Sequence, residues 1–412
     1  MDMKELFRGV AVVIDDEIND SDANIGNIVR QIESADIPIL KYTELPSEKV
    51  IRHFQNLSFL LLDWRLIKEN VTNDEIAEGV TIPDTLQVYD AKGNIEFIKK
   101  LNEKCFCPIF IFTNEDADSI QSSLNEEKLM AADRPSNLFI QSKSDLQNEN
   151  DLFNKVSGWL QSTPSVYVLK EWEREYQNSK TRLFSEFHII NPAWPTIMWK
   201  NFEADGANKS LEMGELISRN LHSRMTPFEF NNEILDKNSE VPRGELRKVL
   251  EGERFLNKNS LHDDDISTGD LFKEEYQDNG ETKYRYYLNI RAQCDLLRSN
   301  NADKVELYCL KGRIFDENKI NNEGGSSIIE GQFIEKINNS IVPFLDGGQI
   351  IEFLFRDIKP KKWKDLKEKR VGRLLPPYIN RIQQRYALYM QRQGLPRIPD
   401  AAIFDNSSSG GS

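Results

Sequence analysis

Four short runs of apolar residues stand out in the first 145 residues, and a polar side chain follows each of them. They occupy residues 10–14, 59–62, 109–112 and 138–140. Short continuous apolar runs bounded by polar residues are typical of strands buried on both faces of a parallel sheet. Residues 148–160 then carry apolar side chains at helical spacing, which predicts a closing helix. The pattern therefore predicts an α/β domain at the start of the chain.

The polar residues after these runs predict a site at one edge of the sheet. Asp15 and Asp16 follow the first run and Asp63 the second, while Thr113 and Lys143 come after the third and fourth. The carboxyl ends of parallel strands line one edge, where ligands bind, so these side chains should converge. Clustered carboxylates need a cation, and hard oxygen ligands favour Mg²⁺. A carboxylate could then accept a phosphoryl group whose oxygens a hydroxyl and an ammonium hold.

This set of residues resembles the receiver domain of two-component response regulators, over roughly the first 160 residues. The resemblance implies a doubly wound, flavodoxin-like parallel sheet of five strands. It also implies that Asp15, Asp16 and Asp63 hold Mg²⁺ and that Asp63 accepts phosphate from a histidine kinase or another phosphodonor. Thr113 matches the switch hydroxyl and Lys143 the active-site lysine of the family. On this basis we expect a regulatory protein rather than an enzyme.

Several positions depart from the usual receiver pattern. Ser144 stands where receivers usually have proline, and Ile140 where an aromatic switch residue is common. The chain between Asp63 and Thr113 is longer than a compact receiver needs, so we expect an insertion at about 64–93. Such an unusual receiver resembles those of bacterial conflict and antiviral defence systems, where a receiver-like subunit accompanies NTPases or other effectors. A protein effector, an NTPase among the candidates, is therefore an expected partner.

The rest of the chain predicts two further regions after a receiver-like domain at 1–163. Residues 164–260 should form a helical connector, whose first helix is either a signalling helix or the first helix of the next domain. Residues 261–405 contain strand-like runs and an Asn-Gly hairpin signal, which predict a small, SH3-like β-rich barrel with a C-terminal helix. The serine- and glycine-rich residues 406–412 look like a linker or tag remnant.

The segment 359–397 differs in charge from the remainder of the chain. It holds twelve Lys and Arg against only Asp365 and Glu368, while the whole chain carries a net charge of −14. Such asymmetry indicates docking on an acidic protein surface or on a nucleic acid. The alternative is that these basic residues pair with carboxylates of the same chain.

Composition narrows the remaining possibilities. No apolar run approaches the ~20 residues of a membrane helix, and no apolar signal segment follows Met1, so we expect a cytoplasmic protein without a membrane contact. One alternative function is a response-regulator transcription factor, with residues 241–248 leading into a DNA-recognition helix. Another is an effector enzyme that uses Cys294 beside Asp295 as a nucleophile.

Overall fold

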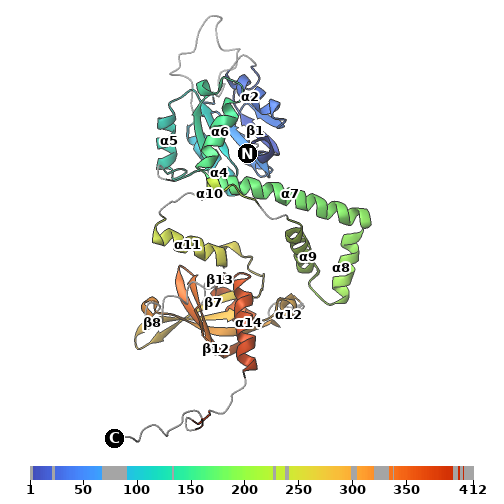
Figure 1. The fold of residues 1–412 in the computed structure, drawn as a ribbon, viewed down its shortest axis with the longest axis vertical. Helices are drawn as coiled ribbons and strands as arrows, with labels where there is room; N and C mark the ends of the chain where they lie inside the picture. Colours follow the sequence, from blue (N-terminus) through green and yellow to red (C-terminus); the bar gives the residue numbers. More distant parts are fainter. Residues whose placement is uncertain are drawn as a thin grey trace, which may run out of the picture. The chain divides into compact units, whose positions relative to one another are not determined.

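The chain divides into two compact units. A computed structural model describes residues 3–20, 24–66, 91–131, 134–225, 229–236, 241–297, 304–319, 334–336, 338–392, 398–399 and 402. The first unit comprises Met1–Pro192 with Ser218–Asn238, and the second Ala193–Ile217 with Ser239–Ser412. Each unit contains one sheet (Figure 1). Most of the expected insertion at 64–93 and all of the expected linker at 406–412 lie outside the described residues.

A five-stranded parallel sheet forms the centre of the first unit. Its strands are β1 (Val10–Ile14), β2 (Ile39–Tyr42), β3 (Leu57–Leu62), β4 (Ile109–Thr113) and β5 (Leu138–Ser142). They lie in the order β2-β1-β3-β4-β5, and every neighbouring pair is parallel. The four strands predicted from apolar runs are all present, and the predicted parallel α/β sheet is confirmed.

Helices cover both faces of this sheet because alternate strand residues point to opposite sides. Successive β4 residues illustrate this, since Phe110 and Phe112 belong to one apolar core and Ile109 and Ile111 to the other. The helices are α1 (Met3–Leu6), α2 (Asn24–Ser34), α3 (Glu48–Ile51), α4 (Ala91–Lys104), α5 (Ala117–Glu126) and α6 (Asp151–Gln161). Residues of α2 and α6 fill the first core and those of α3, α4 and α5 the second, so the domain is doubly wound.

The long helix α7 (Pro164–Ile190) packs its first turns against the receiver-like sheet. Val166 and Tyr167 are buried in the same core as α2 and α6. The ammonium of Lys170, which is 2% exposed, donates a hydrogen bond of 2.7 Å to the carbonyl oxygen of Leu57 at the start of β3. The beginning of α7 is therefore part of the first unit's core.

We expect a fragment of residues 1–192 to be clearly more stable than a fragment of residues 1–162. The shorter fragment lacks Val166, Tyr167 and Lys170, so it exposes apolar core surface and leaves the Leu57 carbonyl without its ammonium partner. Burying one large apolar side chain contributes roughly 1.5–3 kcal/mol, so the difference should reach several kcal/mol. Urea unfolding of both fragments measures it, and equal midpoints would show that α7 adds nothing to this fold.

The middle of the chain is helical, as predicted. It contains α8 (Trp194–Ala204), α9 (Lys209–Arg224), α10 (Asn232–Leu235) and α11 (Arg243–Arg254). Helix α10 contributes Ile234 to the first unit's core. Helix α11 lies against β11 (Asn339–Leu345) in the second unit. None of the described helices is long and apolar enough to cross a membrane.

The second unit contains an eight-stranded antiparallel sheet. Its strands are β6 (Phe255–Asn257), β7 (Asp270–Asp278), β8 (Glu281–Asn289), β9 (Glu306–Ile314), β10 (Ile334–Lys336), β11, β12 (Gln349–Lys362) and β13 (Arg370–Leu374). Their order is β10-β11-β12-β9-β8-β7-β13-β6. The predicted Asn279-Gly280 turn joins β7 to β8, with both residues at positive φ. The β-rich prediction is confirmed, although the sheet is a half-barrel and larger than a small SH3-like barrel.

Short helices and one long helix cover the two faces of the half-barrel. Helix α14 (Tyr378–Gln391) buries Ile379 and Ile382 in the main core on one face, and the predicted C-terminal helix is thereby confirmed. On the other face, α12 (Gln293–Leu297) and α13 (Trp363–Leu366) contribute to a smaller core that contains Phe272 of β7.

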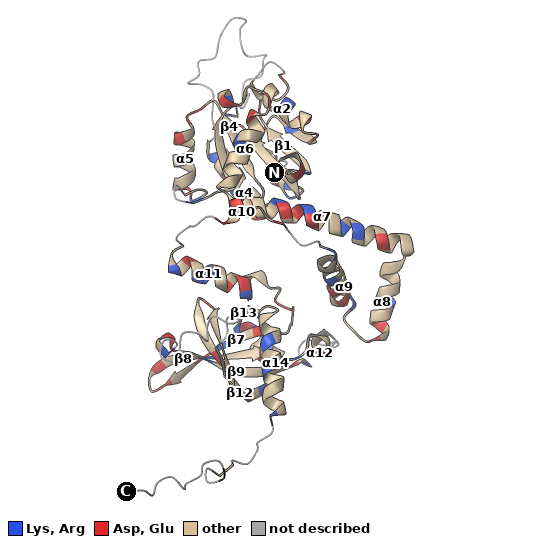
Figure 2. Cartoon of the chain, viewed as in Figure 1, with Lys and Arg blue, Asp and Glu red and all other residues tan. Residues whose placement is uncertain are grey.

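Many basic residues of the segment 359–397 pair with carboxylates of the same unit. Lys367 and Lys369 lie 2.7 Å and 2.8 Å from Asp264 and Glu274. Arg373 makes contacts of 2.8 Å with both Asp265 and Asp270. Figure 2 accordingly shows basic and acidic positions interspersed over this unit. Reversing the charges of Lys367, Arg370 and Arg373 would therefore destabilise the fold. A loss of partner binding in that variant would not identify a docking surface.

Candidate phosphoacceptor site

Three aspartates meet at the carboxyl edge of the parallel sheet. Asp15 directly follows β1 and Asp63 directly follows β3, and these strands are neighbours. The backbone N–H of Asp63 donates a hydrogen bond of 2.8 Å to the carbonyl of Ile14, which fixes the two strand ends side by side. One carboxylate oxygen from each of Asp15, Asp16 and Asp63 lies within 4.8 Å of the other two. The convergence predicted for the three aspartates is confirmed.

The ammonium of Lys143 lies between two of these carboxylates. Lys143 follows β5, and its Nζ donates hydrogen bonds of 2.8 Å to Asp15 Oδ2 and 2.7 Å to Asp63 Oδ2. Lys143 is 1% exposed, and both aspartates are buried as well. A charge-assisted hydrogen bond in a dry environment is stronger than one in water. One buried cation is thus shared between two buried anions.

This sharing shifts the pKa values of the groups in a consistent way. The pKa of Asp63 is raised from its usual 3.8 to about 6, because burial and the nearby Asp15 carboxylate together raise it more than Lys143 lowers it. Burial on its own would lower the pKa of Lys143, but Asp63 and Asp15 hold it above its usual value. The lysine keeps its proton, and one ammonium does not fully offset two carboxylates.

The donor set fits a hard divalent cation. Carboxylate oxygens are the ligands that Mg²⁺ prefers, and it binds through one or two carboxylates while it keeps several waters. Asp16 is half-buried whereas Asp15 and Asp63 are buried, so the cluster opens toward solvent on one side. A second positive charge would also relieve the repulsion that raises the pKa of Asp63. Asp15, Asp16 and Asp63 could therefore hold Mg²⁺.

Thr113 lies at the same edge but outside this hydrogen-bonded group. It is the last residue of β4, which neighbours β3, and it is fully buried. Its hydroxyl accepts a hydrogen bond of 3.0 Å from the backbone N–H of Glu115. Within the described part of the chain, no hydrogen bond joins Thr113 to Asp63 or Lys143. Its assignment as a switch hydroxyl stays a prediction.

The departure at Ser144 has a physical explanation, and the residue after Asp63 is also held by the fold. The backbone N–H of Ser144 donates to Ser142 Oγ at 3.3 Å, a contact that proline could not make because it has no N–H. After Asp63, Trp64 is buried, and its carbonyl accepts a hydrogen bond of 2.6 Å from the Asn94 side chain of α4. The loop that follows the acidic residue is thereby held against α4.

The sequence reasoning did not predict an ion pair near this edge of the sheet. Arg65 NH1 lies 3.3 Å from Glu115 Oε1, and both side chains are partly exposed. The sequence does contain a signal for this pair, because opposite charges stand at matching positions after two strands. Arg65 lies two residues after Asp63, and Glu115 lies two residues after Thr113. This pair joins the loops that follow β3 and β4. An exposed pair of this kind contributes at most ~1 kcal/mol, so we assign it a positioning role at the rim.

The residues behind the two alternative functions lie elsewhere. Cys294 is exposed on α12, and its thiol lies 3.9 Å from the Asp295 carboxylate. Reactive thiols are typically activated by an adjacent histidine or another cationic group. In α11, Arg243 and Arg247 both bind Glu317 of the same unit. Two of the basic residues expected to contact DNA are thus paired with a carboxylate of the same unit.

No protein-family model matches the sequence, and no curated protein matches it either. The receiver-like assignment therefore stands on the strand order β2-β1-β3-β4-β5 and on the acidic cluster beside buried Lys143.

We expect the stability of the first unit to fall as pH rises from 4 to 6 when a chelator removes divalent cations. The pKa of Asp63 is about 6 in the folded chain and 3.8 when unperturbed, so the folded state binds more protons in this window. The Asp63 carboxyl contributes stability that is fully present below pH 4 and is lost as the pH passes 6. The corresponding change in the free energy of unfolding is roughly 3 kcal/mol. Urea unfolding between pH 4 and 6 should show that Asp63→Asn loses less unfolding free energy than wild type. The same pH dependence in both proteins would contradict this expectation.

Proposed function

We propose that this chain is a phosphorylation-responsive regulatory or adaptor protein in which Asp63 is the phosphoacceptor. The observation that carries the proposal is the position of Asp63, which touches the Lys143 ammonium and belongs to a carboxylate cluster that could hold a metal ion. A buried ion pair contributes little net stability, so its place at a ligand-binding edge supports a chemical role. The receiver-like fold around it supports the same conclusion.

The proposed reaction uses groups whose positions the structure gives. An oxygen of ionised Asp63 attacks the phosphorus of the donor, a P–O bond forms, and the bond to the leaving group breaks with its electron pair. With acetyl phosphate the leaving group is acetate. Mg²⁺, when bound, would offset the charge of the phosphoryl oxygens. Lys143 provides a positive charge beside Asp63 Oδ2, and its ammonium would pass from the carboxylate to the phosphoryl group.

Incubation with acetyl phosphate and Mg²⁺ is expected to add one phosphoryl group to the protein. Intact-mass spectrometry should detect the gain in wild type and lose it in Asp63→Asn, which removes the nucleophile but keeps the shape. It should also be lost when a chelator replaces Mg²⁺, because the acidic cluster would then repel the donor's phosphate.

The control for this experiment is Asp118→Asn, which alters an exposed aspartate on α5 of the same unit. This variant should gain phosphate like wild type. An equal gain in Asp63→Asn, or no gain in wild type, would contradict the proposal.

The proposed partners follow from this chemistry. A histidine kinase or another phosphodonor would supply the phosphoryl group, and a protein effector would receive the signal. An NTPase of a bacterial defence system is the effector class that the sequence resemblance favours. For the segment 359–397, Lys359, Lys362 and Lys364 are the exposed cations best placed to contact an acidic partner or a nucleic acid, because they lack an ion-pair partner among the described residues.

A further inference from the structure

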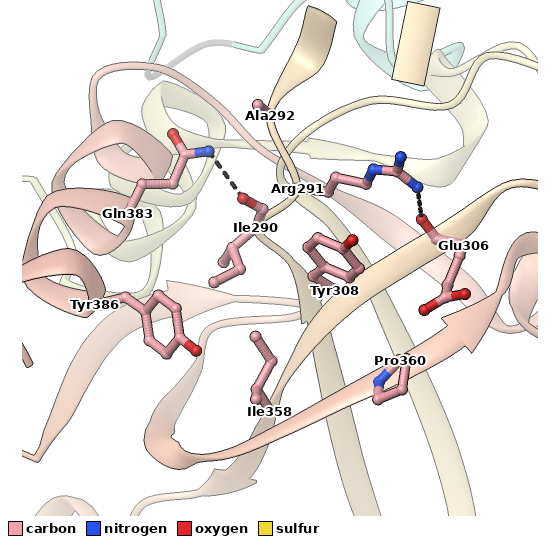
Figure 3. Close-up of a pocket in the computed structure, with 9 residues that line it drawn as sticks. All are labelled: Ile290, Arg291, Ala292, Glu306, Tyr308, Ile358, Pro360, Gln383 and Tyr386. Atoms are coloured by element: carbon pink, nitrogen blue, oxygen red, sulfur yellow. Dashed lines mark hydrogen bonds between the residues drawn. The ribbon is translucent and has the colours of Figure 1, made fainter. Parts of the chain in front are cut away.

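A cavity of about 540 Å³ lies in the second unit, far in sequence from the acidic cluster (Figure 3). Its lining residues come from the segment just after β8, from β9 and β12, and from α14. Sites for small molecules usually have volumes of roughly 300–1,000 Å³ and mostly apolar walls with a few polar groups. The cavity has both properties.

The cavity exists because α14 covers only part of one face of the half-barrel. Tyr308 and Leu310 are two residues apart on β9 and therefore face the same side of the sheet. Leu310 is fully buried, whereas Tyr308 is 43% exposed. Pro360 of β12 stands opposite Tyr308, next to a register shift between Leu354 and Ile358. The core thus ends between Leu310 and Tyr308, and the inner face beyond it is open.

Two tyrosine rings border the open space. Tyr308 of β9 and Tyr386 of α14 lie on opposite sides of it, with Ile290 and Ile358 between them (Figure 3). The guanidinium of Arg291 lies 5.1 Å from the centre of the Tyr308 ring. Arg291 NH1 also donates a hydrogen bond of 2.5 Å to the carbonyl of Glu306, which fixes the arginine against the ring. The walls suit a flat group that stacks on an aromatic face.

The polar groups of the cavity are mainly acceptors. Gln383 Nε2 donates to the carbonyl of Ile290 at 3.0 Å, which orients the amide and leaves its Oε1 available. Glu306 also lines the cavity (Figure 3). Over the described ranges, neither the Glu306 carboxylate nor Gln383 Oε1 has a hydrogen-bond or ion-pair partner. A ligand that fits must therefore present N–H or O–H donors to these two oxygens.

We propose that this cavity binds a flat nitrogen heterocycle with N–H donors, of the kind found in nucleobases. Tyr308 and Tyr386 stack on its faces, and the Glu306 carboxylate and Gln383 Oε1 accept its hydrogen bonds. Arg291 is a positioning residue for the Tyr308 ring. Guanine presents two adjacent N–H donors that a carboxylate accepts together, whereas uracil presents one, so guanine should bind more tightly. The base can arrive on a free nucleotide or within a single strand of nucleic acid.

Isothermal titration calorimetry of the full chain tests this assignment with guanosine monophosphate and uridine monophosphate. Wild type should bind the guanine nucleotide saturably and more tightly than the uracil nucleotide. Tyr308→Leu removes the stacking face and should weaken binding of both at least about tenfold. Glu306→Gln preserves the shape but removes the charged acceptor, so it should weaken guanine binding about tenfold and reduce the preference over uracil.

Two further arms complete the experiment. The first arm compares the affinities of single-stranded tetraguanylate and guanosine monophosphate. Tighter binding of the tetraguanylate identifies a nucleic-acid strand as the source of the base, whereas equal affinities identify the free nucleotide. The matched control is Tyr284→Leu, which changes a 38% exposed tyrosine six residues before Ile290 along β8, roughly 20 Å away. It should bind like wild type.

Three results would overturn the proposal. The first is no saturable binding of either nucleotide or of the oligonucleotide up to ~1 mM. The second is an equal loss of affinity in Tyr284→Leu and Tyr308→Leu. The third is a guanine preference that Glu306→Gln leaves unchanged, because the carboxylate would then not contact the base.

Discussion

Replacing Asp270 by alanine is expected to destabilise the second unit by about 3–5 kcal/mol. Asp270 is fully buried at the start of β7, and its Oδ1 accepts a hydrogen bond of 2.8 Å from Arg373 Nε. Arg370, also buried, lies 3.9 Å from the same oxygen. Without Asp270 its guanidinium loses its nearest carboxylate, and a buried charge without a counterion is costly. The Ser267 backbone N–H would lose its acceptor as well.

Hydrogen exchange of peptides from β7 and β13 measures this effect locally, which matters in a chain of two units that need not unfold together. The matched control is Asp264→Ala, which removes a carboxylate that is 84% exposed and pairs with Lys367. Exchange in the control should match wild type. If both variants exchanged alike, the buried ion pairs would not hold β13 to β7.

The second large effect is expected in Lys143→Met. This substitution removes the ammonium shared by Asp15 and Asp63 and leaves two buried carboxylates facing each other. We expect the first unit to lose about 3–5 kcal/mol at pH 7 in a chelator. Lowering the pH should restore part of the loss, because protonation removes one of the two charges and the pKa of Asp63 is raised already. Added Mg²⁺ should restore part of it at constant pH.

The control for this variant is Lys41→Met, which breaks an exposed ion pair of 3.5 Å with Glu33 on the same unit. Its cost should stay below ~1 kcal/mol and should not depend on Mg²⁺. Thermal unfolding of the three proteins with and without Mg²⁺ separates the outcomes. A loss in Lys143→Met that Mg²⁺ leaves unchanged would show that the carboxylates do not form a cation site.

The sequence predicted the edge of the parallel sheet well because the signal there is local. An apolar run followed by an aspartate places that aspartate at a strand end, and the parallel arrangement brings Asp15 and Asp63 together. The shared contact of Lys143 with both aspartates was beyond the sequence, since it depends on the packing of β5 against β4. Nor could the sequence show that burial raises the pKa of Asp63.

The second unit was harder to predict because its key contacts join distant residues. Arg373 pairs with Asp270, which lies about a hundred positions earlier, so the sequence left open whether the segment 359–397 docks on a partner or pairs with carboxylates of the same chain. The half-barrel is open because α14 covers the sheet face at Leu310 but not at Tyr308. No local sequence pattern predicts how far this cover extends. The sequence therefore predicts that Tyr308 lies in a strand, but it does not predict the cavity beside this residue.

The most direct test of the phosphoacceptor assignment is to locate the phosphoryl group. After reaction with acetyl phosphate and Mg²⁺, borohydride reduction converts an aspartyl phosphate into a stable homoserine residue that peptide mass spectrometry can place. We predict that the modified residue is Asp63, in the peptide that contains the end of β3. Modification at Asp15, Asp16 or any residue other than Asp63, or no modification at all, would contradict the account.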